Sequence, residues 1–124
     1  MTFCSSVHCM DGRIQEPLIA YLKTRYRKKY VDTITEAAPN RILAENKEKG
    51  LVESIFNRIE VSVKHHKSDL IAISGHHDCA GNPVSKEIQL DHIRRARDVI
   101  GKRCPDIRIV QLWINSQWEV EEIL

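Results

Sequence analysis

The chain has 124 residues, a length that predicts one domain, residues 1–124, with room for one hydrophobic core. Hydrophobic residues make up 42% and charged residues 29%, a composition typical of folded globular proteins and not of disordered ones. A formal net charge of +2 is too small to indicate a nucleic-acid partner. The basic run Lys23–Tyr30 is therefore interpreted as the solvated face of a helix.

No stretch of the sequence reaches the roughly 18 apolar residues that a membrane-spanning helix needs, so no membrane partner is predicted. The N-terminal residues lack the charged and apolar regions of a secretory signal, which favours a cytoplasmic location. In a reducing compartment the four cysteines are expected to be free thiols rather than disulfides. Cys4 and Cys104 are interpreted as small buried or loop residues.

The first part of the chain predicts a strand, a helix and a second strand. An apolar run at 2–9 stops at a turn that contains Gly12, as a short strand does. A helix is predicted over 13–30, because apolar residues recur there at helical spacing: Ile14, Leu18, Ile19 and Leu22. The β-branched run at 30–37 predicts a strand, and the segment 41–50 is ambiguous.

The remaining chain continues the alternation. An amphipathic helix is predicted from Leu51 to near Ser68, with one apolar stripe made of Leu51, Val52, Ile55, Phe56, Ile59 and Val63. The apolar run 70–74 predicts a strand buried on both faces. A helix at 84–100 should end at Gly101 and turn four residues inward: Ile88, Ile93, Ala96 and Ile100. Strands are predicted at 106–115 and 118–123, the second of them antiparallel.

Alternating strands and helices predict an α/β fold. We expect a Rossmann-like, mainly parallel sheet of order 2-1-3-4, with an antiparallel edge strand and flanking helices. In such a sheet, sites form beyond the carboxyl ends of the strands where the winding reverses. Cys9 ends the first strand, and His76 and Cys79 follow the third, so these three side chains are expected to converge.

Two thiolates and one imidazole form a donor set that suits zinc. The His-x-x-Cys spacing of His76 and Cys79 lets one loop supply two ligands to the same ion. With Cys9 as the third ligand, the fourth tetrahedral position stays open, as in catalytic rather than structural zinc sites. The sequence therefore predicts a catalytic zinc site, at which bound water would have a pKa of about 7.

Asp11 and Arg13 lie beside the first predicted ligand, in the stretch "HCMDGR". A carboxylate near the metal can orient the bound water, and an arginine can hold that carboxylate through two hydrogen bonds. A structural alternative is an ion pair at a helix N-terminus, where a carboxylate is favoured in any case. His77 could transfer protons or be an ordinary exposed histidine. Trp113 and Trp118 are interpreted as sheet packing or a dimer surface.

The stretches "CMDGR" and "GHHDC" resemble the Cys-x-Asp-x-Arg and Gly-His-x-x-Cys motifs of the β-class carbonic anhydrases. The resemblance implies that Cys9, His76 and Cys79 bind zinc and that Asp11 and Arg13 are catalytic. It also implies hydration of a small-molecule substrate, carbon dioxide, to bicarbonate by a homodimer or higher homo-oligomer.

Two alternatives to carbon dioxide hydration stay open. Some relatives with the same zinc site hydrolyse carbon disulfide or carbonyl sulfide. A non-catalytic zinc protein is the other possibility, for example one in which Asp11 closes the site as a fourth ligand. Water or a permanent carboxylate in the fourth position would distinguish this case from the enzyme.

Overall fold

The computed structural model describes residues 2–123 and is built on one five-stranded sheet. The strands lie in the order β2-β1-β3-β4-β5, and they are β1 (Phe3–Cys9), β2 (Tyr30–Glu36), β3 (Leu70–His76), β4 (Arg108–Ile114) and β5 (Val120–Ile123). All neighbours pair in parallel except β4 and β5, which are antiparallel. The predicted α/β fold, strand order and antiparallel edge strand are confirmed.

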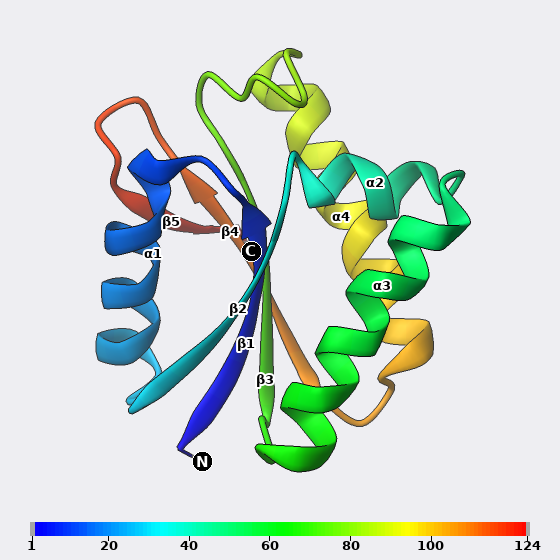
Figure 1. Cartoon of the computed structure of the whole chain (residues 1–124). Helices are drawn as coiled ribbons and strands as arrows, with labels where there is room; N and C mark the ends of the chain where they lie inside the picture. Colours follow the sequence, from blue (N-terminus) through cyan, green and yellow to red (C-terminus); the bar gives the residue numbers. More distant parts are fainter. Residues whose placement is uncertain (1, 124) are drawn as a thin grey trace.

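Helices cover both faces of the sheet (Figure 1). One face is covered by α1 (Gly12–Arg25), and the other by α2 (Pro39–Glu45), α3 (Lys49–Glu60) and α4 (Lys86–Arg103). A short π-helical turn, η1 (Val61–His65), continues α3. Every residue of β3 is buried, and its side chains alternate between the two cores, Ile71 and Ile73 on one side, Leu70 and Ala72 on the other. The sheet is therefore the middle of three layers.

The first helix ends earlier than its sequence predicts. The expectation was a helix to residue 30, but α1 ends at Arg25 and Tyr30 begins β2. Arg27 has a φ of 56°, in the left-handed region, and this residue reverses the chain. The backbone N–H groups of Lys29 and Tyr30 both donate to the carbonyl of Thr2. The basic run 23–30 is thus a helix end and a turn, not the face of one helix.

The predicted end of α4 is also wrong, because the helix passes through Gly101 and continues to Arg103. Ser85 caps its N-terminus by accepting a hydrogen bond from the N–H of Ile88. Ile88 itself is 49% exposed instead of inward, because the buried position of the first turns is taken by Gln89. The other predicted inward residues, Ile93, Ala96 and Ile100, are fully buried.

The ambiguous segment after β2 forms α2 and the start of α3. Most of the predicted apolar stripe of α3 faces the core, but Leu51 lies near the helix start on the solvent side and is exposed. The helical stretch reaches His65 through η1, close to the predicted end. Within residues 2–123, no helix is both long and apolar enough to cross a membrane.

Candidate metal centre

Three side chains from the carboxyl ends of β1 and β3 meet in one cluster. Their donor atoms, the sulfurs of Cys9 and Cys79 and an imidazole nitrogen of His76, lie within 4.8 Å of one another, and all three residues are buried. The two Sγ atoms are 4.0 Å apart. Two thiolates on one tetrahedral zinc, each with a Zn–S bond of about 2.3 Å, stand about 3.8 Å apart. The spacing fits a shared zinc ion and is far too long for a disulfide.

His76 presents the correct nitrogen to this cluster. Its Nδ1 lies 2.8 Å from the carbonyl oxygen of His77, which can only accept, so Nδ1 carries the hydrogen. Nε2 is then left with a free lone pair. Nε2 is buried and has no hydrogen-bond partner among the described residues. A buried imidazole nitrogen without a partner is costly in a folded protein, and a metal ion would satisfy it.

The two thiols favour a single negative charge between them. Hydrogen bonding from Cys79 lowers the pKa of Cys9 to about 4, against the opposing effect of burial. The same interaction, together with burial and the nearby charge on Cys9, raises the pKa of Cys79. Two thiolates at this distance therefore need a cation beside them, and a divalent metal supplies that charge.

Gln89 of α4 holds the backbone of His76. Its Nε2 donates to the carbonyl of His76 at 2.8 Å, while its Oε1 accepts from the N–H of the same residue at 3.3 Å. The side-chain amide thus forms the same two hydrogen bonds with the backbone of His76 that a neighbouring β-strand would form. This approach requires Gly75, because a Cβ atom there would lie 2.6 Å from the Oε1 of Gln89.

Asp11 is both the N-cap of α1 and the partner of Arg13. Its Oδ1 accepts from the backbone N–H of Arg13 at 2.9 Å, which caps the helix. The guanidinium of Arg13 donates to both oxygens, from Nε to Oδ1 at 3.1 Å and from Nη2 to Oδ2 at 2.7 Å. These hydrogen bonds lower the pKa of Asp11 to about 2, so it is a carboxylate at neutral pH. The predicted pair is thus brought together beside Cys9.

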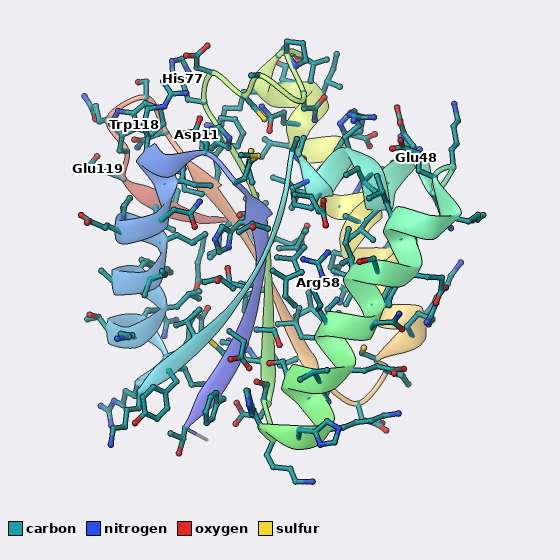
Figure 2. All side chains as sticks on the ribbon, in the orientation of Figure 1. Asp11, Glu48, Arg58, His77, Trp118 and Glu119 are labelled. Carbon is teal, nitrogen blue, oxygen red and sulfur yellow. The ribbon has the colours of Figure 1, made fainter. Side chains whose placement is uncertain are left out.

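Arg13 is also held by Asp78, to which the sequence assigned no role, and by Trp118, which was interpreted as sheet packing or a dimer surface. Its Nη1 donates to Oδ2 of Asp78 at 3.2 Å, and its Nη2 donates to the carbonyl of Asp78 at 3.1 Å. The ring of Trp118 lies against the guanidinium, 4.4 Å from Cζ to the ring centroid. Figure 2 shows Asp11, His77 and Trp118 at the same end of the sheet. Trp113, by contrast, is buried in the core.

The supporting residues were missed because their roles depend on packing between distant elements. Gln89 did leave a signal, since it occupies a polar position in the buried stripe of α4. Asp78 lies between two predicted ligands, but nothing local indicates that its side chain turns back to Arg13. His77 contributes its carbonyl to His76 and its ring to an edge contact with Trp118 at 6.3 Å.

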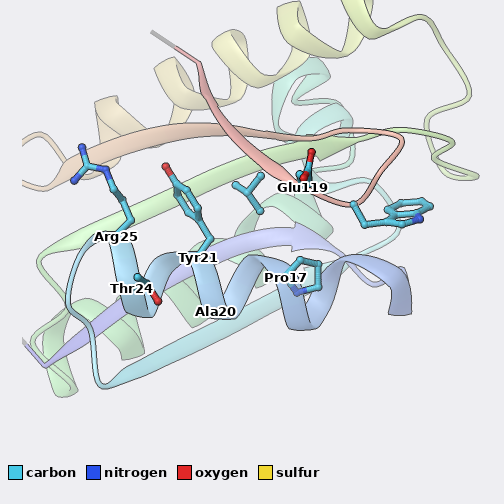
Figure 3. A pocket seen from close by; sticks show the side chains of 8 residues that line it. Pro17, Ala20, Tyr21, Thr24, Arg25 and Glu119 are labelled. Atoms are coloured by element: carbon cyan, nitrogen blue, oxygen red, sulfur yellow. The ribbon is translucent and has the colours of Figure 1, made fainter.

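A groove lies outside the cluster, between α1 and the segment that leads into β5 (Figure 3). It has a volume of about 540 Å³, and Pro17, Ala20 and Tyr21 line its helical side. Trp118 connects it with the site, since this ring lines the groove and also contacts Arg13. The donors of the cluster do not line the groove, so the site is defined by its side-chain chemistry and not by this hollow.

Comparisons with known proteins agree with this arrangement. Residues 1–124 match the sequence model of a family described as "Putative carbonic anhydrase". A search of curated proteins found no match. Two solved structures share the fold. The first, one of two tetrameric β-carbonic anhydrases from Sordaria macrospora, has a TM-score of 0.56 and 13% identity over 98% of this chain and 80% of that chain.

The second is the β-carbonic anhydrase CafA of Aspergillus fumigatus, with a TM-score of 0.55 and 15% identity over 98% of this chain and 74% of that chain. At these identities the two structures show a shared fold. The family match adds a relationship in sequence that extends over all 124 residues. The chain therefore belongs to the carbonic anhydrase family that this sequence model describes.

Proposed function

We propose that the protein is a zinc-dependent carbonic anhydrase, which hydrates carbon dioxide reversibly to bicarbonate and a proton. Cys9, His76 and Cys79 would hold the zinc. The observation that carries this proposal is the buried Nε2 of His76, which has no hydrogen-bond partner among residues 2–123, beside two thiols whose sulfurs are 4.0 Å apart. Family membership supplies the reaction class.

When bound, zinc supplies a Lewis acid that makes hydroxide available near neutral pH. Asp11 is an ionised carboxylate and can only accept hydrogen bonds, so its role is to orient the nucleophile toward the substrate. Arg13 occupies both oxygens of Asp11 and keeps the carboxylate in place. The same bonds compete with coordination of Asp11 to a metal, which favours the enzyme over a zinc protein closed by a fourth carboxylate.

Asp11→Asn tests the proposed role of the carboxylate. Asparagine caps helices about as well as aspartate does, so the fold should be retained. We expect one zinc per chain as in the unaltered protein, with carbon dioxide hydration lowered by about 100-fold or more, because asparagine has one acceptor oxygen and no negative charge where aspartate has two acceptor oxygens. The measurement is stopped-flow hydration at mildly alkaline pH, on samples whose zinc content is determined in parallel.

Asp106→Asn is a matched control, since Asp106 is exposed in the loop before β4 at the opposite end of the sheet. It should hydrate carbon dioxide at the unaltered rate. Full activity in Asp11→Asn would remove the proposed role of Asp11. Zinc binding without hydration in the unaltered protein would reject carbon dioxide as substrate, and carbon disulfide and carbonyl sulfide would be assayed next. Zinc binding without turnover of any of these three substrates would indicate a non-catalytic zinc protein.

We further propose a homodimer or higher homo-oligomer in the cytoplasm. The related structure from Sordaria macrospora is described as tetrameric, which supports self-association. The described cysteines are free, and thiol donors must stay reduced to bind zinc, which supports a reducing compartment. Sedimentation of the zinc-loaded chain tests the assembly, and a monomer at micromolar concentration would contradict it.

A further inference from the structure

Gln15, in the first turns of α1, contacts the turn that carries Cys9 and Asp11. Its Nε2 lies 2.9 Å from the carbonyl oxygen of Cys9 and 2.7 Å from that of Asp11. A carbonyl oxygen only accepts hydrogen bonds, so the group between the two oxygens must be the NH₂ of the side chain, which has two hydrogens to donate. One amide therefore joins the Cys9–Met10 and Asp11–Gly12 peptide groups.

The orientation of the Gln15 amide determines which ring nitrogen of His8 carries a hydrogen. Its Oε1 faces Nε2 of His8 at 2.8 Å and must accept, so Nε2 of His8 carries a hydrogen. The other ring nitrogen, Nδ1, lies 2.8 Å from the hydroxyl of Ser6. Because His8 is fully buried and its two partners are uncharged, the ring is neutral and Nδ1 accepts from Ser6. Hydrogen bonds thus run in one direction from Ser6 through His8 to Gln15.

These hydrogen bonds surround the turn that connects the end of β1 with the start of α1. Cys9 is the last residue of β1, and Asp11 is the N-cap of α1, so the peptide planes between them connect a metal donor with the carboxylate beside it. The N–H of Met10 donates to the carbonyl of Glu36 at 2.8 Å, on the opposite side of the turn. The turn is therefore held from β2 and from α1.

We propose that Gln15, oriented by His8, is a positioning residue of the metal centre. It fixes the turn from Cys9 to Asp11, so that the Cys9 sulfur meets Cys79 and the Asp11 carboxylate meets Arg13. The proposal rests on the proposed zinc site and deepens it, and Gln15 acts through the backbone without touching the metal. Such supporting residues typically change metal affinity by 10- to 100-fold when they are lost.

Gln15→Met is the direct test, because methionine has a similar length and keeps the packing but cannot donate to the two carbonyls. We expect zinc affinity, measured by competition with a chelator, to fall about 10- to 100-fold. The cobalt(II) form should show altered ligand-field absorption bands, which report the donor geometry. The thermal unfolding midpoint in excess chelator should fall moderately, because the buried Nε2–H of His8 loses its acceptor, so zinc affinity is compared at a temperature where both proteins are folded.

Gln111→Met is the matched control, the same change at a half-buried position of β4. Its zinc affinity and cobalt spectrum should be those of the unaltered protein. If Gln15→Met binds zinc as tightly as this control and has the same cobalt spectrum, the proposal is overturned. Failure of the unaltered protein to bind zinc would instead reject the proposed function.

A second measurement uses the unaltered chain and does not depend on how a variant folds. Long-range ¹⁵N–¹H correlation spectra identify which nitrogen of His8 carries the hydrogen. The network requires the Nε2–H form. Observation of the Nδ1–H form would overturn the proposal, because Gln15 would then have to turn its oxygen toward the two carbonyls and could not hold the turn.

Discussion

The carboxylate of Asp11 has two structural roles. Its Oδ1 caps α1, and both of its oxygens accept from Arg13, so the start of the helix and the candidate site share one group. The hydrogen bonds from Arg13 hold the pKa of Asp11 near 2. Protonation of Asp11 is therefore excluded over the neutral range, and its role there is that of an acceptor.

Cys79→Ala should remove zinc and stability together, because metal binding is coupled to folding. At free zinc of about 100 times the dissociation constant, binding stabilises the folded state by about 2.7 kcal/mol. Adding excess chelator should remove that stabilisation from the unaltered protein and change nothing in Cys79→Ala. The measurement is urea unfolding with and without chelator.

Cys104→Ala provides the control, since this half-buried thiol lies at the end of α4 and outside the cluster. It should bind one zinc and respond to chelator as the unaltered protein does. A Cys79→Ala protein that keeps its zinc and its response to chelator would contradict the assignment of Cys79 as a ligand.

The convergence of Cys9, His76 and Cys79 could be predicted because the first two lie at or near strand ends and Cys79 follows soon after, and parallel strand ends meet at one edge of the sheet. The residues that hold these three side chains in position could not be predicted. Gln15 and Gln89 reach the strand ends from helices, through contacts that depend on how each helix packs. Sequence periodicity indicates which side of a helix is buried and not which backbone group a side chain reaches.

At the scale of elements, α4 links the core to the metal centre. Gln89 begins the same buried stripe as Ile93 and pairs with the backbone of His76, so the packing of the helix fixes the end of β3. Close approach at Gly75 makes this pairing possible. Displacement of α4 would thus move a candidate metal ligand.

Gly101→Ala should stabilise the protein, because Gly101 lies inside α4 rather than after it. Alanine is preferred over glycine in a helix interior by about 0.5–1 kcal/mol. The new Cβ would lie no closer than 3.7 Å to Ile109 Cδ1, an ordinary contact. The increase in unfolding free energy can be measured by urea denaturation.

Gly75→Ala is the matched comparison, the same substitution at a crowded position. It should destabilise the protein by about 1–3 kcal/mol, as overpacking of a filled core does. Destabilisation by Gly101→Ala, with a loss comparable to that of Gly75→Ala, would show that the helix does not tolerate a side chain at residue 101.

The sequence predicts the positions of the strands more accurately than the residues at which the helices end. The runs that form β1, β2 and β3 are apolar or β-branched and sit between clear turns, which allowed the strand order to be inferred. The end of α1 depends on the left-handed conformation of Arg27, which no local residue type demands. Glycine often ends helices, but α4 continues through Gly101 to Arg103, directly after the core residue Ile100.

At the scale of the whole molecule, the two ends of the sheet carry different groups. The candidate metal centre lies at the carboxyl ends of β1 and β3. At the amino ends, the buried Lys28 precedes β2 and Asp69 precedes β3. Lys28 donates a hydrogen bond to the carboxylate of Asp69. This pair holds two strand starts together and lies away from the metal donors, so it can be altered separately.

Asp69→Asn should lower stability in a pH-dependent manner. The hydrogen bond from Lys28 lowers the pKa of Asp69 below its ordinary value. The pair therefore contributes stability above the unfolded-state pKa of about 3.9, and loses it as the pH falls through the lowered folded-state pKa. Because the Asp69 side chain is 44% exposed, the effect at neutral pH should be at most about 1 kcal/mol.

The measurement is urea unfolding of both proteins between about pH 5 and about pH 2, where the difference should shrink toward zero. Lys28→Met supplies the control background, in which Asp69→Asn should have a smaller effect at neutral pH. A difference that stays constant with pH, or grows as the pH falls, would show that the ion pair does not carry it.

X-ray absorption at the zinc edge of the loaded protein measures which atoms bind the metal. We expect one zinc per chain with two sulfur ligands at about 2.3 Å and two nitrogen or oxygen ligands at about 2.0 Å. Asp11→Asn should give the same spectrum, because its carboxylate is held by Arg13 and does not bind the metal. A protein without zinc, or zinc without two sulfur ligands, would contradict the assignment of Cys9, His76 and Cys79 as the metal centre.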